Sequence, residues 1–133
     1  LKTCDMLSLH LPVTQETTGM CNREFFGKCR KGSYFINTSR GELVDDEALL
    51  EALENGTIAM AGLDTLDHEP VQKDHPMLSW PREILDRIVF SPHIGGITGS
   101  SFRRGYGMIW DDIEKVAKGE VPGHIVNWKE LEQ

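Results

Sequence analysis

The segment Ile58 to Leu63 (IAMAGL) is the feature that most limits what this chain can fold into. Its six residues are almost uninterruptedly apolar, which is typical of a parallel β-strand buried on both faces. Strands of this kind are covered by helices, so the segment predicts an α/β architecture.

The rest of the sequence continues the same alternation. We expect further strands over Cys4 to Leu11, Ser33 to Asn37 and Ile88 to Phe90, helices over Asn22 to Lys28, Asp46 to Glu54 and Ser100 to Lys118, and a long loop over residues 65 to 86. Asn22 and Asp45 suit the helix N-cap position. The last helix carries an apolar stripe at steps of four and three residues, so we expect it to pack on an apolar surface. Together these elements predict a parallel sheet with helices on its faces.

Charge and composition exclude several classes of function. The 14 Lys and Arg residues are scattered against 21 Asp and Glu residues, for a net charge of -7, which argues against nucleic acid as a partner. No apolar run approaches the roughly 18 to 20 residues of a membrane span, and no secretory signal is recognisable. The 3 cysteines form no Cys-x-x-Cys pair, which favours free thiols and a cytoplasmic location.

Ligands of open parallel sheets bind beyond the carboxyl ends of the strands, so the residues there are the candidates for chemistry. Arg40 follows the second strand, and its guanidinium suits a carboxylate, although a surface pair with Glu42 or Asp45 is equally consistent. Asp64 follows the third strand, where its side chain either accepts a hydrogen bond from a ligand or caps a turn. His93 follows the fourth, where it acts as an acid or base or bonds to a backbone carbonyl.

Glu69 lies in the loop after the third strand. A carboxylate bonded to an imidazole stabilises the protonated ring and fixes its tautomer, but a separation of 24 residues from His93 does not establish the pairing. A solvated acidic loop is the alternative. A metal site built from His68, Glu69, His75 and His93 is a weaker possibility, because no pair has the usual ligand spacing, and we expect no metal.

Four motifs together resemble the D-isomer-specific 2-hydroxyacid dehydrogenases. They are Leu9 to Thr14 (LHLPVT), Lys31 to Asp45 (KGSYFINTSRGELVD), Ala61 to Asp64 leading to Glu69-Pro70, and Ser91 to Gly96 (SPHIGG). They occur in the family's order and spacing, and the resemblance covers nearly the whole chain.

The resemblance implies hydride transfer between NAD or NADP and a D-2-hydroxy acid or its 2-oxo form. Arg40 would hold the substrate carboxylate, His93 would be the acid or base at the C2 oxygen, and Glu69 would pair with His93. The positions that match the family's cofactor contacts are Leu11, Pro12, Thr38, Ser39, Arg40, Asp64, His93 and Gly96. A homodimer is also implied. A dinucleotide-sensing, corepressor-like binding protein on the same scaffold is the alternative function.

One family motif is missing. The pyrophosphate-binding G-x-G-x-x-G occurs nowhere in the 133 residues. We therefore expect a partial doubly wound sheet, the second half of a Rossmann-type NAD(P)-binding domain, over residues 1–98. Residues 99–133 would form a crossover helix and a tail that returns to a substrate domain outside this sequence. The isolated fragment is expected to be inactive.

Overall fold

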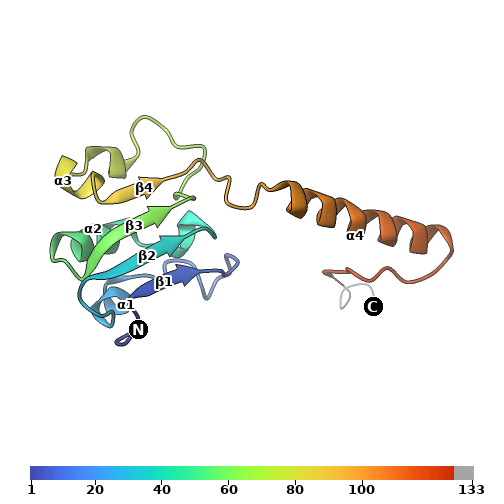
Figure 1. Cartoon of the computed structure of the whole chain (residues 1–133), viewed down its shortest axis with the longest axis horizontal. Helices are drawn as coiled ribbons and strands as arrows, with labels where there is room; N and C mark the ends of the chain where they lie inside the picture. The colour runs from blue at the N-terminus through green and yellow to red at the C-terminus, as the bar shows by residue number, and fades with distance from the viewer. Residues whose placement is uncertain (128–133) are drawn as a thin grey trace. The chain divides into compact units, whose positions relative to one another are not determined.

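In the computed structural model, which describes residues 1–127, the chain divides into two compact units. The first, Leu1–Gly95, holds four parallel strands in the order β1-β2-β3-β4, shown side by side in Figure 1. They are β1 (Met6–Leu9), β2 (Ser33–Asn37), β3 (Ile58–Leu63) and β4 (Ile88–Phe90). The α/β class and the parallel sheet are confirmed.

Helices of the first unit cover one face of this sheet. They are α1 (Arg23–Gly27), α2 (Asp46–Glu54) and α3 (Arg82–Leu85), with two short 3-10 turns at Gly41–Leu43 and Pro76–Ser79. Phe26 of α1 packs edge-on against Phe35 of β2, and the apolar side of α2 is buried in the same core. Leu49, Leu53 and Phe35 are fully inaccessible. This core fixes the strands and therefore the loops that follow them.

The opposite face of the sheet is not covered by any helix of the first unit. Tyr34 and Met60, which are register partners on β2 and β3, are 44% and 39% exposed. Within Leu1–Gly95, no helix covers the side of the sheet on which Met60 lies, so the predicted burial of Ile58–Leu63 on both faces is not seen in this unit.

The caps confirm the sequence signals at two helices. The Asn22 side chain accepts the Phe25 N–H at α1, and Asp45 accepts the Ala48 N–H at α2. The first strand is shorter than predicted, since its paired register with β2 covers only Met6–Leu9. The predicted loop 65–86 contains α3 and one 3-10 turn.

The second unit begins at Gly96 and contains α4 (Gly99–Ala117), where the sequence predicted a helix over Ser100 to Lys118. A capping box joins Thr98 and Ser101 at its start. The helix buries none of its described side chains, so packing of its apolar stripe stays a prediction. The division at residues 98 and 99 and the returning tail also stay predictions, and residues 128–133 lie outside the described part. No helix within residues 1–127 has the length and apolar character to cross a bilayer.

Candidate active site

The carboxyl edge of the sheet brings His93 and Glu69 together. The loops after β3 and β4 place the Nδ1 atom of His93 2.6 Å from Oε2 of Glu69, while Oε1 of Glu69 accepts the Leu66 N–H at 2.8 Å. Both carboxylate oxygens are thus anchored, and the His93 and Glu69 side chains stay 43% and 31% exposed. The pair that the sequence left open is formed in the structure.

The charge of Glu69 decides which atom of the pair carries the proton. Burial raises the pKa of the Glu69 carboxyl. Hydrogen bonds from His93 and Leu66, together with the positive charges of His93 and Arg40, lower this pKa by more than burial raises it, so it lies below the usual value. An ionised carboxylate can only accept, so Nδ1 of His93 donates. The ring is then either the Nδ1–H tautomer or the imidazolium, and Nε2 is the atom available to a reactant.

Arg40 shares a cavity of about 420 Å³ with this pair. The cavity is lined by Arg40, Gly41, Glu42, residues 65 to 69 and His93. In one cavity, a guanidinium can bind a carboxylate while a protonatable imidazole donates a proton to a neighbouring oxygen or accepts one from it. A second, mostly apolar hollow of about 720 Å³ adjoins Glu69 and His93 from the side of Phe90 and Leu78.

Asn37, which the sequence analysis passed over, supports Arg40. It is fully buried at the end of β2, where its Nδ2 donates to the Arg40 carbonyl at 2.7 Å and its Oδ1 accepts the Ser39 N–H at 3.0 Å. The sequence signal for this role was an Asn as the last residue of an otherwise largely apolar strand, because a buried side-chain amide needs hydrogen-bond partners.

Gly41 lets the loops after β2 and β3 touch. A Cβ atom at this position would overlap the carbonyl group of Leu66 and the backbone nitrogen of Asp67. Only a residue without a side chain permits this approach, which brings the Glu69 loop beside Arg40.

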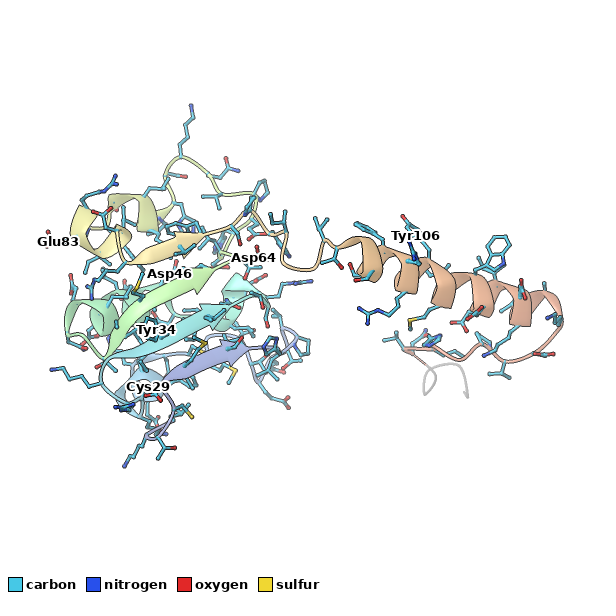
Figure 2. The ribbon with its side chains drawn as sticks, viewed as in Figure 1. Cys29, Tyr34, Asp46, Asp64, Glu83 and Tyr106 are labelled. Atoms are coloured by element: carbon cyan, nitrogen blue, oxygen red, sulfur yellow. The ribbon has the colours of Figure 1, made fainter. Side chains whose placement is uncertain are left out.

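Asp64 binds the loop after β4. Its carboxylate accepts the Ser91 hydroxyl, the Ile94 N–H at 3.0 Å and the Gly95 N–H at 2.7 Å. The Ser91 hydroxyl foremost, then the two N–H groups and the charge of His93, lower the pKa of the Asp64 carboxyl against the opposing effect of burial. Of the two interpretations of Asp64, the turn contact is seen directly. Figure 2 shows this residue at the end of β3.

The residues predicted to line a dinucleotide lie on the neighbouring strand ends. The Leu11 N–H donates to the Ser39 hydroxyl at 3.2 Å, which ties the loop after β1 to the loop after β2. Leu11, Pro12 and Thr38 are exposed there. Gly96 is the first residue of the second unit, and its part in a site stays a prediction.

The metal alternative finds no ligand set in residues 1–127. Nε2 of His75 lies 3.1 Å from the Asp67 carbonyl, and its Nδ1 accepts the Met77 N–H at 3.3 Å, so both ring nitrogens already serve the backbone. His68 pairs with Asp67 instead of pointing to a shared centre.

Residues 1–95 match the family described as D-isomer specific 2-hydroxyacid dehydrogenase, NAD binding domain. The chain is 39% identical over 127 residues to a glyoxylate reductase of Thermofilum pendens, covering 96% of this chain and 36% of that protein.

Two solved structures are similar in fold and sequence. An NAD-complexed D-isomer specific 2-hydroxyacid dehydrogenase of Lactobacillus delbrueckii ssp. bulgaricus superposes with a TM-score of 0.78 at 36% identity, covering 95% of this chain and 41% of that one. A D-isomer specific 2-hydroxyacid dehydrogenase of Xanthobacter autotrophicus in complex with NADPH and MES gives 0.74 at 32% identity, covering 92% and 47%. The chain therefore spans less than half the length of these relatives.

Proposed function

Because the chain belongs to the family of D-isomer-specific 2-hydroxyacid dehydrogenases, we propose that the whole protein transfers hydride between a nicotinamide dinucleotide and a D-2-hydroxy acid or its 2-oxo form. The observation that carries the proposal is the His93 and Glu69 pair on one cavity with Arg40. The cavity offers a cation for a carboxylate beside an acid or base for an oxygen.

Each of the three side chains has a role in this proposal. The Arg40 guanidinium binds the substrate carboxylate, and its charge stabilises the alkoxide that develops at C2 during reduction. His93, protonated at both nitrogens, donates from Nε2 to that oxygen and takes the proton back in the oxidation direction. Glu69 accepts from Nδ1 throughout, so the ring cannot turn away.

The strand ends fit the nicotinamide half of NAD or NADP. The carboxylate of Asp64 has about four acceptor positions, of which three are used, so one on Oδ2 remains for a carboxamide N–H. Hydroxyls of Thr38 and Ser39 and the apolar side chains of Leu11 and Pro12 supply the remaining contacts, together with Arg40, His93 and Gly96. A bound nicotinamide would supply or accept the hydride at C2.

The pyrophosphate half has no loop in this sequence, so the isolated chain is expected to bind dinucleotide weakly and to be inactive. We propose that residues 1–98 complete a dinucleotide domain and that residues 99–133 return toward a substrate domain. A cytoplasmic homodimer that acts on a small 2-oxo acid is the corresponding proposal for the whole protein.

The experiment replaces the matching segment of the Thermofilum pendens glyoxylate reductase with this chain and follows NADH oxidation with glyoxylate, hydroxypyruvate and pyruvate. We expect turnover with at least one acid, and a fall in kcat of about 10² to 10⁴ in the His93→Ala chimera. His124→Ala, a histidine of the second unit, is the matched control and should keep the rate. A folded chimera whose rate survives His93→Ala would overturn the proposal. NADH-dependent capture of a protein partner without any turnover would favour the dinucleotide-sensing alternative instead.

A further inference from the structure

The turn that carries His93 is built around a single residue, Asp64, which directly follows β3. Three consecutive N–H groups, those of His93, Ile94 and Gly95, all donate to Asp64: the first to its backbone carbonyl at 2.8 Å, the other two to its carboxylate. The hydroxyl of Ser91 donates to the same carboxylate. Asp64 is only 5% exposed, so water competes little for these bonds.

The backbone of His93 needs such support. Its φ of 55° lies in the left-handed region, which L-residues with a side chain rarely adopt. That conformation turns the N–H groups of residues 94 and 95 toward Asp64 while the imidazole faces Glu69. Residues held in sparsely populated backbone regions persist only where their surroundings impose the conformation.

Gly95 shows how closely the turn approaches the carboxylate. A Cβ atom there would lie 2.8 Å from Oδ2 of Asp64, closer than such atoms come in real structures. The turn and the carboxylate are therefore fitted to each other.

We propose that Asp64 is a positioning residue for His93, whose carboxylate holds the turn from Ser91 to Gly95 in the conformation that directs Nδ1 of His93 to Glu69. The catalytic value of this device rests on the proposed function, but the structural part does not. The family resemblance assigns Asp64 only to the cofactor. Positioning is a distinct role, because it operates before any ligand binds.

The test uses Asp64→Asn in the 133-residue chain without ligand. The side chain keeps its shape, but its NH₂ group cannot accept, so one of the two N–H groups that faced the carboxylate now faces a donor. By NMR we expect the Ile94 and Gly95 amides to exchange with solvent roughly tenfold faster or more, and the His93 ring to lose its preference for the Nδ1–H tautomer. Asp74→Asn, an exposed acid in the loop after β3, removes the same charge and should change neither.

Unchanged exchange and an unchanged tautomer in a folded Asp64→Asn chain would overturn the proposal. If that variant does not fold, Gly95→Ala tests the same fit from the other side with Asp64 intact, and the same two readouts should move. A folded Gly95→Ala chain in which both the amide exchange and the His93 tautomer are unchanged would also overturn the proposal.

The catalytic part is tested in the chimera. A positioning role predicts that Asp64→Asn lowers kcat about 10- to 100-fold and shifts the pH profile of kcat, in addition to any weakening of NADH binding through the lost carboxamide contact. A weakened Kd with unchanged kcat and unchanged amide exchange would assign Asp64 to the cofactor alone. If His93→Ala leaves turnover intact, the proposed function fails while the exchange result still decides the structural part.

Discussion

Gly41→Ala is the substitution for which the structure makes the sharpest prediction. The added methyl group would occupy the space of backbone atoms of Leu66 and Asp67, which cannot move aside by changing rotamer. The chain must therefore separate the loop that carries Arg40 from the loop that carries Glu69. The expected result is a loss of stability together with a displaced Glu69.

The magnitude follows from two opposing effects. Forcing an extra carbon into a packed site costs about 1 to 3 kcal/mol, and the upper end applies here because the obstacle is backbone. Replacing Gly by Ala restricts the unfolded chain and returns about 0.4 to 1 kcal/mol. A net loss of about 2 kcal/mol remains, which lowers the Tm of a unit of this size by roughly 8 to 16 °C.

Urea unfolding followed through the amide resonances of β2 and β3 measures the loss, and the Leu66 amide, which donates to Glu69, reports on the displaced loop. Gly27→Ala is the matched control. No atom lies within 4 Å of a Cβ there, and the position ends α1, so this variant should be as stable as the wild type or more stable. If Gly41→Ala is within about 0.5 kcal/mol of Gly27→Ala, or leaves the Leu66 amide unchanged, the reasoning about this contact is wrong.

Three further predictions follow from buried or paired groups. The pKa of the folded Glu69 carboxyl lies below its usual 4.5, so the ionised carboxylate stabilises the fold above that pH, and this contribution is lost as pH falls through the lowered pKa. The difference in unfolding free energy between wild type and Glu69→Gln should therefore shrink as pH falls below about 4.5. Burial raises the pKa of the Cys21 thiol to about 12, so native protein at pH 8 should resist alkylation by iodoacetamide at Cys21 until urea unfolds it, as mass spectrometry of peptides can show. Asn37→Ala should cost about 1 to 3 kcal/mol in urea unfolding, because it leaves the Arg40 carbonyl and the Ser39 N–H without their partner.

Local signals predicted the elements whose ends depend on nearby residues. Helix α2 begins after Asp45 and ends before Asn55-Gly56, and both ends agree with the sequence because a cap and a stop act within one turn. Strand β1 was predicted too long, since its length depends on how much of β2 it can pair with. Helix α3 has only four residues, too few for periodicity, and exists because Ile84 reaches the core.

In the candidate site too, features set by local sequence were predictable, whereas contacts made through tertiary structure were not. Arg40, Asp64 and His93 were predictable as candidates because a strand end is visible in the sequence. The pairing of Glu69 with His93 was implied by the family resemblance alone, since it joins residues 24 apart through tertiary structure. The sequence carried no signal for the contact of Gly41 with the Leu66 backbone. A glycine that permits close approach of two backbones cannot be told from the sequence apart from one that permits a turn.

These contacts explain why a chain spanning less than half of its relatives can still hold the His93–Glu69 pair in a preorganised geometry. Each loop at the carboxyl edge is fixed by the loop of a neighbouring strand: Leu11 by Ser39, the Leu66 backbone by Gly41, and the His93 turn by Asp64. Parallel strands lie about 4.8 Å apart, so such loops meet without help from distant segments. Electrostatic catalysis depends on groups that are oriented before the reaction and need no reorganisation during it. The four-stranded sheet therefore suffices to orient His93 toward Glu69, whereas binding a dinucleotide requires a pyrophosphate loop, which no pair of these strands provides.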